Sequence, residues 1–198
     1  MTDFLKVSKN LKCRGYEVKV FSSGAAAADY INGKTDGKTV GIGGSSTVED
    51  LGLYEMLASH NEVIWHWKQD ADTARKRAMT ADVYISSANA LAETGEIINI
   101  DGVGNRISSL LFGHEKIYFL IGRNKLTENY ESAVLRARNV AAPGRARQLN
   151  KKTPCAEAAD RCYDCRSADR ICNGMVVLWG PMTGMEAEVV LIDEDLGL

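Results

Sequence analysis

The sequence predicts an α/β protein with a three-layer α/β/α fold and a mainly parallel sheet. Apolar segments of strand length alternate with segments of helical period over most of the 198 residues. This alternation is typical of parallel strands with helices packed on both faces. Only the two final apolar segments, 175–179 and 188–192, follow each other with no helix between them. We expect these two to form an antiparallel strand pair at the C-terminus.

Helices are predicted where apolar residues recur every three or four positions. In the segment 3–14, Phe4, Val7 and Leu11 share one face, and Gly15 ends the helix. The remaining helices are expected at 24–31, 48–59, 72–79, 106–112 and 128–142, with Pro143-Gly144 ending the last of them.

Strands are predicted where apolar and polar residues alternate, or where a short apolar run lies between turn residues. Val18 and Val20 alternate with charged residues in the first strand. The predicted strands before the closing pair are 17–21, 39–43, 61–67, 82–86, 96–100 and 116–121.

Composition and charge indicate a globular protein of the cytoplasm. Hydrophobic residues make up 45% of the chain, charged residues make up 25%, and the net charge is −2. A chain without a basic face is not expected to bind nucleic acid, and no segment approaches the ~20 apolar residues of a membrane span. The N-terminal residues contain no apolar run, so we expect no secretory signal and, by default, a cytoplasmic location. No repeat or linker divides the chain, so residues 1–198 are expected to form one domain with a cysteine-rich loop at 153–174.

A turn rich in glycine and hydroxyl residues is the first candidate binding site. Gly43 and Gly44, between a predicted strand and a predicted helix, let the backbone approach a ligand closely. Ser45, Ser46 and Thr47 add hydroxyl donors, and the start of the following helix offers free N–H groups. These features suit a phosphate or a carboxylate. The alternative is a tight turn that binds nothing, and the lack of a lysine after the glycines excludes a P-loop.

Polar residues after two later strands are the second candidate. In open α/β sheets, ligands bind in the crevice at the carboxyl ends of the strands. Asn89 and Glu93 follow one strand, and Asp101, Asn105 and Arg106 follow the next. We expect them to face the same crevice as the glycine–serine turn, with Glu93 as nucleophile or general base and Arg106 as an anion clamp. For each residue alone, a helix cap or a solvated charge is the alternative.

Four of the five cysteines lie in one short segment with the spacing Cys-x6-Cys-x2-Cys-x6-Cys. In a reducing compartment, clustered cysteines indicate metal binding or redox chemistry before disulfides. A turn between the central pair could bring all four sulfurs into a site for zinc or an iron–sulfur cluster. The spacing matches neither ferredoxin pattern nor a zinc ribbon, so the metal is left open, and ordinary loop cysteines are the alternative. The candidate ligands are Cys155, Cys162, Cys165 and Cys172.

Several segments, taken in order, resemble the LUD-domain family of lactate utilization proteins, most of all its short four-cysteine members. The matching segments are 40–52, 81–90, 99–106, 151–155 and 165–173. The resemblance implies the fold of the ribose-5-phosphate isomerase and CoA-transferase-like superfamily, in which the glycine–hydroxyl turn often contacts a phosphate. The CoA transferases carry a catalytic glutamate in a Glu-Asn-Gly motif, whereas Glu93 is followed here by Thr94 and Gly95.

Two functions follow as expectations. The resemblance implies an accessory or redox-associated protein of lactate or other organic-acid metabolism. Zinc or a cluster would then occupy the four cysteines, and an iron–sulfur subunit or a second copy of the chain would be the partner. The residues themselves favour an enzyme or sensor that binds a small phosphorylated, CoA-linked or carboxylate ligand at the glycine–serine turn. Both expectations leave open whether the chain is an enzyme.

Overall fold

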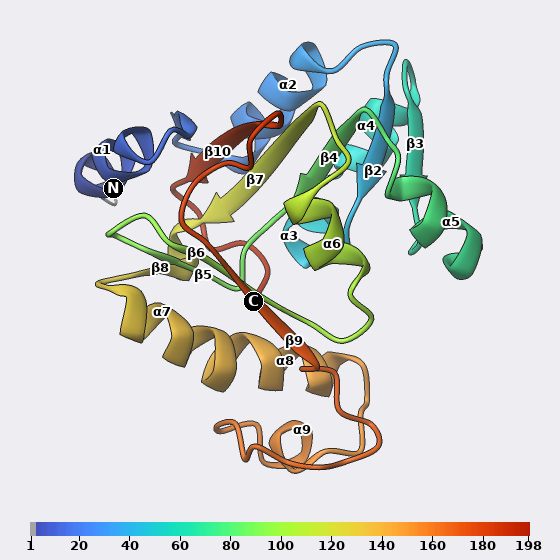
Figure 1. Ribbon diagram of the computed structural model, residues 1–198. Helices are drawn as coiled ribbons and strands as arrows, with labels where there is room; N and C mark the ends of the chain where they lie inside the picture. Colours follow the sequence, from blue (N-terminus) through green and yellow to red (C-terminus); the bar gives the residue numbers. More distant parts are fainter. Residues whose placement is uncertain (1–2) are drawn as a thin grey trace.

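The computed structural model describes residues 3–198, so residues 1 and 2, which belong to the predicted domain and N-terminus, lie outside the described residues. Its main sheet has six strands in the order β1-β10-β7-β4-β2-β3, and every neighbouring pair is parallel (Figure 1). These strands are β1 (Glu17–Phe21), β2 (Thr39–Ile42), β3 (Glu62–Trp65), β4 (Val83–Ser86), β7 (Lys116–Gly122) and β10 (Glu186–Ile192).

A second, mixed sheet has the order β8-β5-β6-β9. The β5–β6 and β6–β9 pairs are antiparallel, and the β5–β8 pair is parallel. Two of its strands have three and two residues and were not expected from the sequence. The four strands are β5 (Ala90–Ala92), β6 (Ile97–Asp101), β8 (Leu126–Thr127) and β9 (Gly174–Leu178).

The helices connect the strands and cover the sheets (Figure 1). The α-helices are α1 (Leu5–Cys13), α2 (Gly24–Lys34), α3 (Ser46–Asp50), α4 (Leu53–Ala58), α5 (Ala71–Ala78), α6 (Asn105–Leu111), α7 (Tyr130–Arg136), α8 (Ala142–Gln148) and α9 (Pro154–Ala158). A 3-10 turn, η1 (Arg123–Lys125), follows β7, and a π-helical turn, η2 (Ala137–Ala141), joins α7 to α8.

Two helix predictions were wrong in their bounds. The helix expected at 48–59 is divided into α3 and α4 because Gly52 adopts a left-handed conformation, with φ of 64°. The helix expected to end at Pro143 continues through α8. The π-helical turn ends at Ala141, and Pro143 is the second residue of α8, in the first turn, where a helix tolerates proline.

The central strand β7 shows how the three layers form. Ile117, Phe119 and Ile121 point to one face of the main sheet, where they pack with α1, α5, α6 and the second sheet. Tyr118 and Leu120 point to the other face, where they pack with α2, α3 and α4. Successive side chains of a strand alternate between its faces, so a continuous apolar run fills two cores at once. The predicted three-layer α/β/α fold with a mainly parallel sheet is confirmed.

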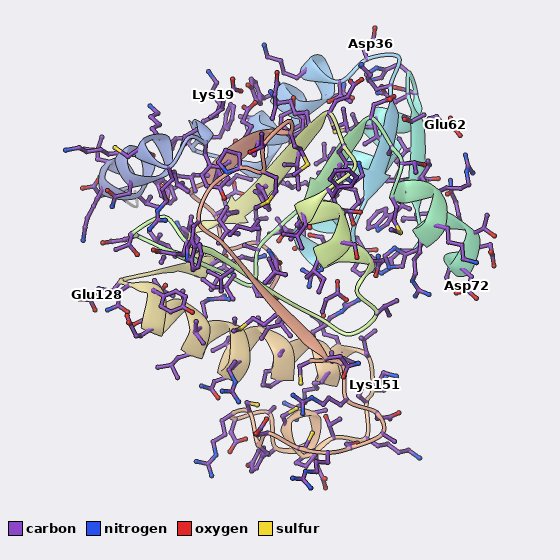
Figure 2. All side chains as sticks on the ribbon, viewed as in Figure 1. Lys19, Asp36, Glu62, Asp72, Glu128 and Lys151 are labelled. Atoms are coloured by element: carbon purple, nitrogen blue, oxygen red, sulfur yellow. The ribbon has the colours of Figure 1, made fainter. Side chains whose placement is uncertain are left out.

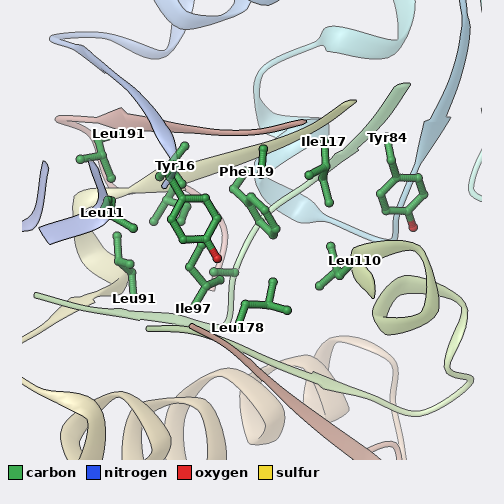
Figure 3. Packing of buried hydrophobic residues seen from close by; sticks show 14 of the residues in the cluster. Leu11, Tyr16, Tyr84, Leu91, Ile97, Leu110, Ile117, Phe119, Leu178 and Leu191 are labelled. Atoms are coloured by element: carbon green, nitrogen blue, oxygen red, sulfur yellow. The ribbon is translucent and has the colours of Figure 1, made fainter. Parts of the chain in front are cut away.

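The core between the two sheets is large, and a smaller one lies beyond it. Leu11 of α1, Leu110 of α6 and Leu178 of β9 lie on the same side of the main sheet as Phe119 (Figure 3). On its outer face the second sheet packs its alanines and Ile98 against α7. Small residues let this helix approach the sheet closely.

The predicted antiparallel pairing of the two closing strands was wrong. β9 pairs antiparallel with β6 in the second sheet, whereas β10 lies between β1 and β7 in the main sheet and is parallel to both. The two strands differ in burial. Six of the seven residues of β10 are buried, whereas only one of the five residues of β9 is buried. A strand that is apolar on both faces is more stable in the centre of a covered sheet than in an exposed hairpin.

Charged side chains lie mostly around the outside of the molecule (Figure 2). Within residues 3–198, no helix combines the length and the apolar character that crossing a membrane requires. Three lysine, arginine, aspartate or glutamate residues are nevertheless buried among the described residues: Glu96 just before β6, Lys125 beyond the carboxyl end of β7, and Glu188 within β10. The labelled examples on the outside are Lys19, Asp36, Glu62, Asp72, Glu128 and Lys151.

Candidate functional site

A small cleft of about 80 Å³ lies at the carboxyl ends of β2, β4 and β7 and is closed on one side by α8. It brings together the predicted residues Gly44, Ser45, Ser46, Thr47, Asn89 and Arg106. Parallel strands present their carboxyl ends at one edge of the sheet, so loops far apart in the sequence meet there. The polar side chains that sequence reasoning missed in this cleft are those of Ser87 and Lys125. Arg145, from the basic run before the cysteines that could serve the anion crevice, also lines it.

The glycine–serine turn positions the edge of this cleft. The Ser45 hydroxyl accepts a hydrogen bond from the backbone N–H of Val48 at 3.3 Å and caps α3. A Cβ atom on Gly43 would lie 2.9 Å from the Tyr84 hydroxyl and 3.0 Å from Cγ of Arg106, so only glycine lets the chain pass there. Because α3 has only five residues, the charge of the cleft comes from side chains rather than from a long helix.

Lys125 is the most buried cation of the site, with 3% of its surface exposed. Its Nζ atom donates hydrogen bonds to Thr47 Oγ1 at 2.7 Å and to Ser87 Oγ at 2.9 Å. No carboxylate in the described part of the chain forms an ion pair with it. Burial lowers the pKa of Lys125 to about 7, and the positive charges of Arg136 and Arg106 act in the same direction. Its place in η1, just beyond the carboxyl end of β7, was the one available signal for a site residue, but nothing along the chain indicated that the side chain is buried.

Arg106 is held in place by groups at the end of β6. One of its Nη atoms donates to Asn99 Oδ1 at 3.0 Å, and the other donates to the carbonyl oxygen of Ile100. Asp101 lies 3.7 Å from Nε of Arg106, and its carboxylate also accepts from the backbone N–H of Arg106 at 3.1 Å. Asp101 therefore orients the arginine and caps α6, while the guanidinium borders the cleft.

Two more arginines lie beside the cleft. Arg145 stacks its guanidinium 4.7 Å above the ring centroid of Trp67. Burial lowers the pKa of Arg145 below its usual value, with a smaller contribution from Arg106. Arg136 donates to the carbonyl oxygens of Asn124 and Asn89, and burial lowers its pKa as well. Burial is the first cause for both arginines, and repulsion between neighbouring cations contributes only for Arg145, so removal from water is the main reason that their charged forms are disfavoured.

A second cavity of about 280 Å³ adjoins the cleft and shares Gly44, Arg106 and Arg145 with it. Of the predicted residues, Asp101 and Asn105 border this cavity rather than the cleft. His66 and Trp67 form another part of its wall. Burial lowers the pKa of His66, and the charge of Arg75 adds to that effect. Apart from Gly43 and Glu93, the predicted site residues of the two candidate loops thus border two adjoining spaces, one small and cationic and one larger and mixed.

The expectation that Glu93 faces the same crevice was wrong. Glu93 lies in the tight turn between β5 and β6, where its carboxylate pairs with Lys6 of α1 at 2.6 Å. Asn10 of the same helix donates to the Glu93 carbonyl oxygen at 2.7 Å. The antiparallel hairpin turns the chain away from the carboxyl edge of the main sheet, so Glu93 borders neither cavity of the site.

The cysteine-rich loop has a cavity of its own. Cys162 and Cys172 line a space of about 240 Å³ together with Arg138 and Arg170. The Asp164 carboxylate lies 3.8 Å from both of these arginines. Two of the four thiols therefore face one cavity that also carries positive charge.

The four sulfurs do not form a metal site as they stand. Sγ of Cys155 lies 3.3 Å from the Thr153 hydroxyl at the start of α9. Among residues 3–198, no group of three or more histidine, cysteine, aspartate or glutamate side chains is arranged to hold a metal ion. The predicted site for zinc or an iron–sulfur cluster on the four cysteines therefore lacks the required geometry here.

Comparison with known proteins identifies the family. The LUD domain family matches residues 5–192. Among solved structures, a DUF162 family protein from Deinococcus radiodurans is similar, with a TM-score of 0.54, 12% sequence identity, and coverage of 97% of this chain and 99% of that chain. At this identity the similarity shows the shared fold alone. No curated protein sequence matches the chain. Because the family match extends over nearly the whole chain, this protein belongs to the LUD-domain family and is, in that general sense, of the lactate-utilization type.

Proposed function

We propose that this protein binds a small anionic ligand in the cleft, and that it acts on this ligand or senses it in the organic-acid metabolism of the cytoplasm. The ligand class is a compound with a carboxylate or phosphate group, including phosphorylated and CoA-linked compounds. The observation that carries the proposal is the concentration of cations at one small cavity, which Lys125, Arg106 and Arg145 line together. A site of this charge and size favours an acidic group over a neutral one.

The environment of Lys125 supplies the physical reason. An ammonium group that is taken out of water loses hydration free energy, and two hydroxyls replace only part of it. An anion in the cleft would add the missing charge interaction. Since the pKa of Lys125 is about 7, anion binding above that pH is expected to be coupled to proton uptake by this side chain.

The two adjoining cavities favour a ligand with an acidic end and a larger remainder. The cleft of about 80 Å³ takes the acidic group, and the adjoining space of about 280 Å³ takes further atoms. Trp67 and His66 in the larger space offer apolar contact and hydrogen bonding.

Thermal unfolding with a panel of anions tests the proposal. Inorganic phosphate, pyruvate, lactate and a CoA ester are added separately, and a ligand that binds only the folded protein raises the melting temperature. Arg106→Gln should remove the rise, whereas Lys19→Gln, a change of an exposed lysine outside the cleft, should retain it. If no anion raises the melting temperature of the wild type more than that of Arg106→Gln, the proposal is rejected.

A redox-associated role of the four cysteines is a second proposal, with zinc or an iron–sulfur cluster as the cofactor. It is supported by the cavity that Cys162 and Cys172 share with Arg138 and Arg170, because positive side chains would offset thiolate charge. The proposal requires the other two thiols to move to the same point when metal binds. Elemental analysis and an absorption spectrum of protein purified without oxygen test it.

A partner for the accessory role is also proposed, either an iron–sulfur subunit or a second copy of the chain. Trp179, directly after the edge strand β9, is 70% exposed, and Met175 on that strand is also exposed. Large exposed apolar side chains at a sheet edge support a protein contact. The mass of the purified protein in solution, compared with that of Trp179→Ser, tests whether a contact between copies forms there.

A further inference from the structure

The hydrogen bonds around Lys125 fix the direction in which each proton points. Oγ of Ser87 lies 2.6 Å from the carbonyl oxygen of Leu120, and a carbonyl oxygen can only accept. The Ser87 hydroxyl therefore donates there and must accept from Lys125. Thr47 has the same arrangement, because its Oγ1 lies 3.3 Å from the carbonyl oxygen of Leu196. Both contacts to Nζ thus consist of an N–H of Lys125 donating to a hydroxyl oxygen.

This network fits a neutral amine. An uncharged amine has two N–H groups and one lone pair, and the two hydroxyls accept from both N–H groups. An ammonium group has a third N–H, for which the residues at positions 3–198 provide no hydrogen-bond acceptor. The side chain also lines the cleft, so the remaining position of Nζ is the one left for a ligand. The low pKa of Lys125, caused first by burial, agrees with this arrangement.

We propose that Lys125 is a nucleophilic amine that forms an imine with the carbonyl carbon of a small 2-oxo acid, whose carboxylate is bound by Arg106 and Arg145. This inference rests on the proposed function, because the same cleft holds the acidic group. In a 2-oxo acid the carbonyl carbon is bonded directly to the carboxylate carbon, so anchoring the acid brings the electrophile to the buried amine. The small size of the cleft suits a compound of few atoms.

The reaction needs no other reagent. The lone pair of Nζ attacks the carbonyl carbon, and the π electrons of the C=O bond move to oxygen. The resulting carbinolamine loses its oxygen as water, which carries away the two protons that were on nitrogen. A C=N bond to Nζ remains, and the number of atoms and electrons is unchanged.

Trapping with cyanoborohydride tests the inference on the full chain. The protein is incubated with pyruvate and sodium cyanoborohydride, which reduces an imine to a stable secondary amine, and the adduct is located by peptide mass mapping. We expect one adduct per chain, on Lys125. Acetone, a neutral ketone of similar size, should give at least about tenfold less adduct, because it lacks the charged hydrogen bonds to the arginines. Excess inorganic phosphate should suppress the pyruvate adduct by competition.

Variants and a binding measurement separate this inference from the proposed function. Lys125→Met should abolish the adduct, and Lys19→Met, a matched change of an exposed lysine, should leave it unchanged. Mapping on the wild type keeps the test valid even if Lys125→Met does not fold. If calorimetry shows that pyruvate or phosphate binds but trapping labels no lysine or only surface lysines, the imine is rejected while the anion site stands. If acetone labels Lys125 as well as pyruvate does, the proposed substrate class is rejected.

Discussion

The Asp101 carboxylate contacts Arg106 in two ways, since it accepts from the backbone N–H of Arg106 at 3.1 Å and lies 3.7 Å from the guanidinium Nε. Both groups are largely buried, with 9% and 13% of their side-chain surfaces exposed. The sequence alone indicated both residues as ligand contacts. In the structure only Arg106 borders the cleft. The Asp101 carboxylate instead accepts from backbone N–H groups of α6 and contacts the guanidinium of Arg106.

Asp101→Asn should weaken anion binding by roughly tenfold, because an amide does not hold the guanidinium as a carboxylate does. The direction of the change in anion affinity distinguishes two roles of Asp101. If Asp101 acted only through its negative charge, removal of that charge would strengthen anion binding instead of weakening it. The free energy of unfolding should also fall, by about 1–3 kcal/mol, because both carboxylate oxygens accept from backbone N–H groups and an amide can replace only one of them. Calorimetry with phosphate and urea unfolding measure the two effects. Asp29→Asn, a change of an exposed carboxylate on α2, is the control, and tighter binding by Asp101→Asn would contradict the orienting role.

Gly43→Ala should destabilise the fold and damage the cleft together. The added Cβ would lie 2.9 Å from the Tyr84 hydroxyl and 3.0 Å from Arg106 Cγ, so one of these side chains must move. Overpacking of this kind lowers the free energy of unfolding by about 1–3 kcal/mol. Gly33→Ala is the matched control, because nothing lies within 4 Å of its Cβ, and alanine inside α2 should stabilise the protein by roughly 0.5–1 kcal/mol. Equal effects of the two changes on urea unfolding would show that Gly43 is not constrained by its neighbours.

The stability contribution of Lys125 should depend on pH. Its pKa is about 7 in the folded protein and near the ordinary 10.5 in the unfolded chain. Between these values the unfolded chain binds a proton that the folded protein does not, so the free energy of unfolding rises with pH, by at most about 1.4 kcal/mol per pH unit. Below pH 7 both states are protonated, and the cost of the buried charge is present in full.

Urea unfolding of the wild type and of Lys125→Met from below pH 7 to about pH 10 measures this dependence. As pH rises, the free energy of unfolding of the wild type should increase relative to that of Lys125→Met. Saturating phosphate should flatten the slope, because a bound anion raises the pKa of Lys125 towards its ordinary value. A difference that does not change with pH would mean that the buried lysine keeps its proton throughout.

The order of the main elements and part of the site were predictable because both follow from local patterns. Apolar periodicity located the six strands of the main sheet, and the rule that ligands bind at carboxyl ends placed Thr47 and Arg106 together. β5 and β8 were missed because strands of three and two residues have no period to detect. Their formation depends on partners distant in the sequence.

Lys125 and Glu93 show why the rest of the site was not predictable. Lys125 lies among polar residues after β7, and nothing in its neighbourhood along the chain indicates that the side chain is buried. Its burial results from Thr47 and Ser87, which are 78 and 38 residues away. Glu93 follows Asn89 closely in the sequence, yet the hairpin between β5 and β6 carries it to α1. Both outcomes depend on contacts between residues far apart in the sequence, which local patterns do not indicate.

The cysteines allow a prediction that distinguishes a metal site from ordinary loop thiols. If zinc or a cluster binds, Cys162→Ser and Cys165→Ser should each lose most of the bound metal, since each removes one of four thiolate ligands. Cys13→Ser, a change of the exposed cysteine outside the loop, should keep it. Metal content is measured on protein purified without oxygen, and visible absorption identifies a cluster. Metal at equal amounts in all three variants would exclude the four-cysteine site. Protein that is free of metal and equally stable would leave the cation-lined cleft as the functional centre.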